Sequence, residues 1–115
     1  MKREFRLKKR AAFTYVYKRG ERTRSRHLTL LAAKSGEGLK IGLSVSKKVG
    51  GAVTRNHVKR LLREALTPLT AAINPAFMYV IVAHPTAAEL DFKAVCSETE
   101  KLFLKAGKLA VPEAK

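Results

Sequence analysis

Apolar residues recur at helical spacing in three parts of the chain. The first part follows the basic N-terminus and ends at Gly20, where a glycine commonly terminates a helix. The second has Thr54 as a candidate N-cap and keeps an apolar stripe as far as Leu69. The third begins at Asp91, another candidate N-cap, and carries its stripe to Ala106. These patterns predict three helices.

Three other segments have the pattern of β-strands. Residues 27–34 and 39–46 are predicted strands, and the glycine-containing segment 35–38 is the turn between them. Residues 77–83 are apolar on both faces, which is typical of a central strand covered on both sides. Because a helix separates 39–46 from 77–83, we expect these two strands to run parallel.

The predicted fold is a two-layer α/β (α+β) sandwich, in which about three helices pack on a small mixed sheet in the order α-β-β-α-β-α. We expect one domain over residues 1–115, with an extended basic arm at 1–8 and a flexible tail at 107–115. No apolar run approaches the ~18 residues of a membrane span, and the N-terminus lacks the apolar segment of a signal peptide. The single cysteine, Cys96, excludes an internal disulfide and suits the cytoplasm. The protein alone is expected to be a monomer.

Positive charge is concentrated in the first half of the chain. The sequence holds 24 Lys and Arg against 9 Asp and Glu, a formal net charge of +15. Residues 1–63 carry 19 of the basic and 3 of the acidic residues, whereas residues 64–115 carry 5 and 6. A charge needed only for solubility would be spread evenly. This segregation indicates a surface that binds a polyanion, either a nucleic acid or an anionic membrane.

The stretch KKVGGAVTRNHVKRLLRE, residues 47–64, places cations on one side of the predicted middle helix. On a helical wheel Arg55 and His57 lie at the flanks, and four residues lie opposite the apolar stripe: Asn56, Lys59, Arg60 and Arg63. Only the pair Arg60–Glu64 is attractive among the charged pairs spaced by four residues, so an external anion is expected to offset the repulsion. A face that is merely solvated is the alternative.

Lys47 and Lys48 stand beside a glycine pair just before this helix, where backbone N–H groups favour phosphate. The segment GGAVTRN matches neither spacing of the familiar nucleotide-binding loops, so simple turn chemistry is the stronger interpretation. The two interpretations merge if the phosphate belongs to an RNA backbone.

Phe13 and Tyr17 are neighbours, one turn apart, on the first predicted helix. They either belong to the core or line a groove in which the bases of a single-stranded nucleic acid stack on them. The arm before them supplies cations at Arg6, Lys8 and Lys9 for the same polyanion.

The sequence offers no residue set for catalysis by the protein itself. No two of its histidines have metal-ligand spacing: His27, His57 and His84. Helix capping explains Asp91 better than a carboxylate pair with Glu89 does. We therefore predict a binding protein without catalytic residues or metal ligands. A ribosomal-protein-like RNA-binding module, and a ribonuclease that uses two histidines and a lysine, are the alternatives.

At KKVGGAVTRNHVKRLLRE the sequence closely resembles the protein component of bacterial ribonuclease P. The resemblance extends to RLKKRAAFTYVYKRG at 6–20, IGLSVSKK at 41–48 and YVIVAHP at 79–85, and so covers most of the chain. It implies a compact α/β fold in which the strand–helix–strand crossover is left-handed, against the usual rule.

In that family an RNA subunit carries out the Mg²⁺-dependent hydrolysis that removes the 5′ leader from precursor tRNA, and the RNA holds most of the Mg²⁺. The resemblance implies that the protein grips the leader in a cleft lined by Phe13, Tyr17, Leu31, Ser46 and Lys48. It also implies that the RNA subunit meets Lys47, Lys48, Arg55, Asn56, His57, Lys59, Arg60 and Arg63. Two positions depart from the family pattern: His57 replaces an arginine and so gives up a permanent charge, and Leu31 stands where an aromatic residue is common.

Overall fold

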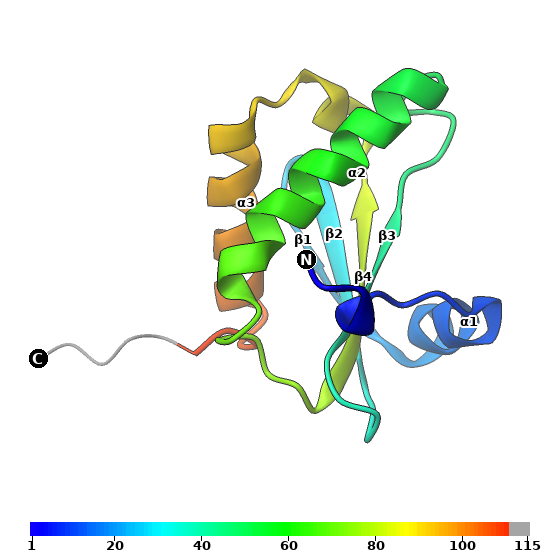
Figure 1. Cartoon of the computed structure of the whole chain (residues 1–115), viewed down its shortest axis with the longest axis vertical. Coiled ribbons are helices and arrows are strands. Elements are labelled where there is room, and N and C mark those ends of the chain that lie inside the picture. Colours follow the sequence, from blue (N-terminus) through cyan, green and yellow to red (C-terminus); the bar gives the residue numbers. More distant parts are fainter. Residues whose placement is uncertain (111–115) are drawn as a thin grey trace, which may run out of the picture.

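The structure is a computed structural model that describes residues 1–110, and it contains three α-helices and a four-stranded sheet (Figure 1). The α-helices are α1 (Arg10–Arg19), α2 (Ala52–Leu66) and α3 (Phe92–Lys105). The strands are β1 (Glu21–Arg24), β2 (Leu28–Lys34), β3 (Lys40–Ser44) and β4 (Phe77–Ala83). Three short 3-10 helices are η1 (Arg3–Phe5), η2 (Thr67–Leu69) and η3 (Pro85–Glu89). The predicted α+β sandwich with a mixed sheet is confirmed.

The strands lie in the order β1-β2-β4-β3, and β3 runs parallel to β4 as predicted. Residues 35–38 connect β2 to β3, but these strands are not neighbours because β4 lies between them and pairs with both. The central place of β4 agrees with its apolar side chains on both faces. The edge strand β1 was not predicted, since its sequence ERTR has no apolar alternation.

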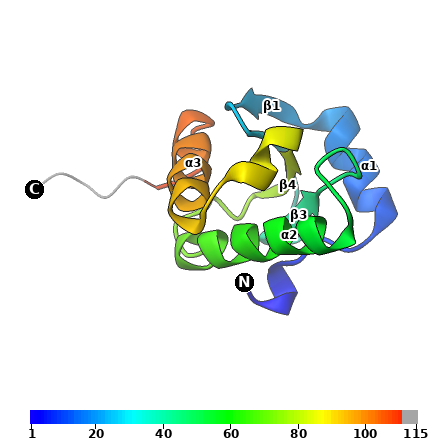
Figure 2. The same ribbon diagram turned by 90° about the horizontal axis from the view of Figure 1, so that it is seen from above.

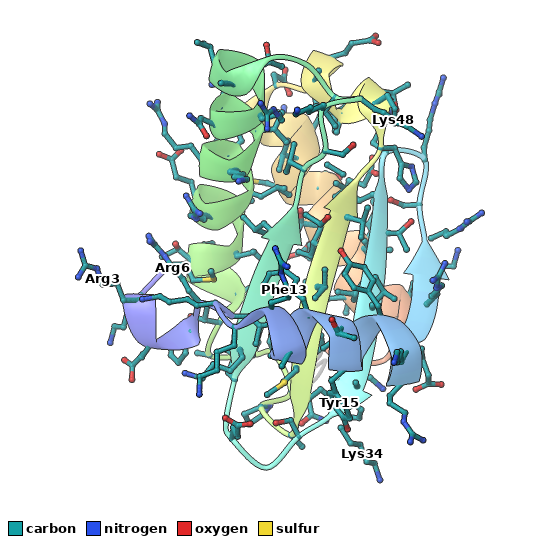
Figure 3. The ribbon with its side chains drawn as sticks, turned by 90° about the vertical axis from the view of Figure 1, so that its right-hand side faces the viewer. Arg3, Arg6, Phe13, Tyr15, Lys34 and Lys48 are labelled. Carbon is teal, nitrogen blue, oxygen red and sulfur yellow. The ribbon has the colours of Figure 1, made fainter. Side chains whose placement is uncertain are left out.

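The helices cover both faces of the sheet (Figure 2). The larger core cluster lies between the sheet and the pair α2 and α3, whereas a smaller cluster lies beneath α1. Figure 3 looks onto the α1 face, with β3 to the left of β4 and both strands pointing up. Seen from the α2 side the step from β3 to β4 therefore goes to the left, which is the left-handed crossover that the family resemblance implied.

Two helix starts differ in their capping. The Asp91 carboxylate accepts a hydrogen bond from the backbone N–H of Ala94 (2.8 Å), so the predicted cap of α3 is confirmed. The α2 helix begins at Ala52, before the predicted cap Thr54, and Gly51 occupies the N-cap position without a side chain to offer. None of the helices within residues 1–110 is both long and apolar enough to cross a membrane.

The two terminal segments are more ordered than the sequence indicated. In the arm, the backbone N–H of Leu7 donates to the carbonyl of Ile41 (3.0 Å), and the Leu7 side chain is buried. The arm thus extends the sheet at the edge of β3. Residues 107–110, expected as the start of a tail, are hydrogen-bonded to residues 72–74. Residues 111–115 of that predicted tail lie outside the described part of the chain.

Candidate nucleic-acid interface

Four residues on the outer side of α2 make up what we call the cationic face: Asn56, Lys59, Arg60 and Arg63. Asn56 and Arg60 are exposed, while Lys59 and Arg63 are partly buried. Arg60 Nε lies 3.7 Å from Glu64 Oε1, the only ion pair that α2 makes within residues 1–110. An exposed pair of this kind contributes about 0–1 kcal/mol. The face therefore keeps most of its positive charge available for an external anion.

Arg55 and His57 flank the cationic face, as the helical wheel predicted. His57 is exposed. Arg55 Nε instead donates a hydrogen bond to the carbonyl of Gly50 (3.1 Å) and closes the turn before α2. This bond stabilises a helix start that has no side-chain cap. Arg55 therefore has a structural role, which the sequence pattern did not reveal.

The N-terminal arm brings two further cations to the cationic face. Arg6 and Lys8 join Lys59 and Arg63 around a cavity of about 220 Å³, and no acidic side chain among residues 1–110 lines it. Burial, and secondarily the charge of Arg6, lowers the pKa of Arg63 from its usual value. The Arg6 Nε atom is buried without a hydrogen-bond partner within residues 1–110. A phosphate oxygen would offset this repulsion and desolvation. Lys9, at the N-cap of α1, lies outside this cavity.

The turn after β3 presents Ser46, Lys47 and Lys48 to solvent. The Ser46 hydroxyl accepts a hydrogen bond from the backbone N–H of Lys48 (3.3 Å), and the Ser46 carbonyl accepts one from Val49 (3.0 Å). Val49 is buried and fixes the turn to the core. The two lysines are thus exposed cations on an anchored turn at the end of β3 away from α1 (Figure 3).

Phe13 and Tyr17 lie on one flank of α1, but the sheet holds them differently. Phe13 is partly buried and its ring lies directly over Gly42, where any side chain would collide with it. Tyr17 is 39% exposed, so it is not a core residue. Leu31, predicted to line the leader cleft, is only 2% exposed and packs in the cluster beneath α1. Its side chain has almost no surface to offer a ligand, because α1 covers it.

On the side of Leu31 away from α1, a row of paired residues runs across the four strands. These residues were not predicted as site residues from the sequence. Cα pairing aligns Ser44 with Val82, Val82 with Thr29, and Thr29 with Arg24. Ser44 and Val82 are partly exposed. Since α1 crosses the opposite end of the strands, this row lies between Phe13 and the turn that carries Lys48 (Figure 3). In β3, Gly42 and Ser44 alternate with the apolar Ile41 and Leu43, and this alternation was the signal that could have identified Ser44.

Two of the histidines lie side by side and make structural hydrogen bonds: the backbone N–H of His84 donates to the carbonyl of His27 (2.9 Å). His84 Nδ1 lies 3.1 Å from the carbonyl of Arg26, so it must donate, and in the neutral ring His84 Nε2 then accepts from the Thr29 hydroxyl (2.7 Å). His27 Nδ1 pairs with the Thr86 hydroxyl at 2.7 Å. Across residues 1–110, His, Cys, Asp and Glu side chains nowhere gather in threes that could hold a metal ion.

Comparison with known proteins identifies the family. The family model described as ribonuclease P matches residues 1–107. The chain is 42% identical over 112 residues to the ribonuclease P protein component of Shouchella clausii (strain KSM-K16), covering 96% of this chain and 92% of that protein. A Staphylococcus aureus RNase P protein mutant with defective mRNA degradation activity has a TM-score of 0.85 and 29% identity, covering 91% of this chain and 90% of that one. The RNase P protein from Thermotoga maritima has a TM-score of 0.79 and 27% identity, covering 87% and 96%. The chain belongs to the family of bacterial ribonuclease P protein components.

Proposed function

We propose that this protein binds the RNA subunit through the cationic face of α2 and binds the 5′ leader of precursor tRNA through the surface beside α1. Membership of the family makes it a subunit of the ribonucleoprotein endonuclease that processes tRNA, with the ribonuclease P RNA as its partner. The proposal assigns particular surfaces to the two RNAs.

The observation that carries the proposal is the uncompensated charge at α2. Its cations make one weak ion pair, and the arm adds Arg6 and Lys8 beside Lys59 and Arg63. Folding brings these charges together although repulsion costs stability. A polyphosphate backbone supplies the missing counter-charge and releases its own bound cations, which favours association.

The surface proposed for the leader runs from Phe13 and Tyr17, over the sheet row of Ser44 and Val82, to Ser46 and Lys48. It combines aromatic rings with small polar groups and a cation. Stacking on an aromatic ring contributes about 1–3 kcal/mol per base without requiring a particular sequence. Such a surface suits leaders of varied sequence. Leu31 takes no part, because it is buried.

Hydrolysis is assigned to the RNA subunit, with Mg²⁺ held mainly by RNA. The residues of the protein bind and orient RNA strands, and their positive charge lowers the electrostatic cost of bringing substrate and catalytic RNA together. No step in this proposal needs a metal held by the protein alone.

A cleavage assay at low Mg²⁺ tests the assignment with precursor tRNA and three preparations: the protein alone, a bacterial ribonuclease P RNA alone, and both together. We expect cleavage at the mature 5′ end to be fast only with both. If adding protein to the RNA gives no acceleration, the proposal fails. Cleavage by the protein alone would favour a nuclease that acts without RNA.

Two variants separate the surfaces when affinities for the RNA subunit, precursor tRNA and mature tRNA are measured over a range of salt concentrations. Arg60→Gln should weaken binding of the RNA subunit and reduce the salt dependence by about one phosphate contact, a slope change near 0.7–0.9. Tyr17→Ala should instead reduce the preference for precursor over mature tRNA, and it should not unfold the protein because Tyr17 is exposed. Lys93→Gln, an exposed lysine of α3, is the matched control. An equal loss of affinity for precursor and mature tRNA would place Tyr17 outside the leader site. The alternative, an RNA-binding module without leader specificity, would then hold.

A further inference from the structure

A large basic hollow lies on the flank of α1 opposite to Phe13 and Tyr17. Its volume is about 770 Å³, and it is bounded by the N-terminal arm, α1 and the connection between β2 and β3. Figure 3 shows Phe13 on one side of α1 and Tyr15 with Lys34 on the other. The hollow is thus separated from the proposed leader surface by the body of α1. No predicted site residue accounts for it apart from the cations of the arm.

Cations dominate the wall of the hollow. Within the described residues 1–110, one acidic residue, Glu37, and six basic residues line it; the basic residues are Arg3, Arg6, Lys8, Lys9, Lys34 and Lys40. They come from the arm and from the ends of β2 and β3. Since one carboxylate cannot neutralise six cations, the hollow attracts a polyanion rather than a single small anion.

The wall also carries an aromatic ring that is held for stacking. Tyr15 is 41% exposed, and its hydroxyl donates a hydrogen bond to the carbonyl of Lys34 (2.7 Å), which fixes the ring at the rim. The side chains of Ala12 and Met78 provide an apolar floor beside it. An aromatic ring, an apolar floor and surrounding cations are what a single-stranded nucleotide segment requires.

We propose that this hollow is a second RNA-binding site, in which an unpaired nucleotide stacks on Tyr15 while its flanking phosphates meet the arm and Lys34. The occupant is a single-stranded segment of the RNA subunit. The argument is continuity: Arg6 and Lys8 line both this hollow and the cavity against Lys59 and Arg63 of α2. Phe13 also lines that cavity. The rest of the proposed leader surface, however, runs from Tyr17 toward Ser46 and Lys48, away from the arm, whereas a strand held by Lys59 and Arg63 reaches the hollow directly along the arm. The choice of partner rests on the proposed function.

Affinity measurements on the assembled enzyme test the site. Tyr15→Ala should weaken binding of the RNA subunit by about fivefold or more, as expected for one lost stacking contact, while the ratio of affinities for precursor and mature tRNA stays within twofold. Tyr15→Phe keeps the ring but loses the hydrogen bond to Lys34, so its affinity should lie between those of the unmodified protein and Tyr15→Ala. Lys34→Gln should lower the salt slope by about 0.7. Circular dichroism melts of each variant establish that the fold is retained. Tyr17→Ala, on the other flank, should lower the ratio of affinities for precursor and mature tRNA and leave the affinity for the RNA subunit unchanged.

Cross-linking identifies the strand in the hollow. In the background Cys96→Ser, Lys34→Cys carries a thiol-linked aryl azide, and irradiation of the assembled enzyme with precursor tRNA should attach it to the RNA subunit. Attachment to the leader instead, or to neither RNA, overturns the proposal, as does an equal loss of affinity in Tyr15→Phe and Tyr15→Ala. The unmodified protein is tested alongside. If it does not accelerate cleavage by the RNA subunit, the proposed function itself fails. If it does, but the variants bind the RNA subunit as well as the unmodified protein, only this site is rejected.

Discussion

Replacing Gly42 by alanine tests whether Phe13 is held against the sheet where the structure places it. A Cβ atom on Gly42 would lie 2.5 Å from Cζ and 2.6 Å from Cε1 of the Phe13 ring, and 3.3 Å from Cβ of Leu7. Carbon atoms in contact are about 3.5–4.0 Å apart. The ring must therefore move by about 1 Å, away from β3.

Two opposing effects set the size of the change in stability. Alanine restricts the unfolded chain and stabilises the fold by about 0.4–1 kcal/mol, whereas overpacking costs about 1–3 kcal/mol. Because the atoms that collide belong to the far end of a partly buried ring, the ring can swing outward and the cost stays moderate. We expect a net loss of about 1–2 kcal/mol in the free energy of unfolding.

Urea unfolding of Gly42→Ala, Phe13→Leu and the double variant measures this effect as a double-mutant cycle. Leucine is shorter than phenylalanine, so Gly42→Ala should cost much less when Phe13 is already replaced. Gly42→Ala alone should also reduce the preference for precursor over mature tRNA, while binding of the RNA subunit is unchanged. A neutral or stabilising Gly42→Ala with no coupling to Phe13→Leu would refute the placement of the ring.

Three further predictions address other contacts. Glu64→Gln removes the one carboxylate paired with the cationic face and should strengthen binding of the RNA subunit, measured by fluorescence anisotropy; weaker binding would contradict the role of that face. Asp91→Ala should lower the free energy of unfolding by about 1 kcal/mol, while Asp91→Asn, which keeps an oxygen acceptor, should lose less. Burial raises the pKa of Tyr79 to about 12 from its usual 10. The stability that its neutral hydroxyl contributes is therefore complete below pH 10 and is lost as the pH rises to 12. Tyr79→Phe should therefore flatten the decline in stability over that range, and an identical decline would show that Tyr79 is not responsible.

Much of the fold follows from periodicity in the sequence. The apolar stripe of α2, the capping of α3 by Asp91 and the fully apolar β4 each predicted the observed element, because burial on one face or both leaves a regular pattern. The strand β1 left no such pattern, since it lies at the sheet edge with only Thr23 partly buried. Neighbours in the sheet also escaped prediction: nothing local in residues 28–44 says that a strand from much later in the chain will come between β2 and β3.

The candidate site was predicted unevenly for a similar reason. The helical wheel correctly placed Lys59, Arg60 and Arg63 away from the core, because angular position on a helix follows directly from sequence spacing. Burial beneath another element does not follow from sequence spacing. The prediction therefore placed Leu31 in the cleft although α1 covers it. The hollow beside Tyr15 could not be predicted at all, since three separate segments form its walls.

The position of β4 between β2 and β3 has a consequence for synthesis on the ribosome. Lys34 pairs with Phe77 and Leu28 with Ala83, so the centre of the sheet closes only by joining residues 43 to 55 positions apart. Until residue 83 has emerged, both β2 and β3 present an unpaired inner edge, and the repelling cations of α2 have no completed core to hold them. Loop closure over this distance must precede most of the stabilising contacts, which slows folding relative to helical proteins of the same size. The nascent chain therefore cannot complete its sheet before nearly three quarters of it has been made.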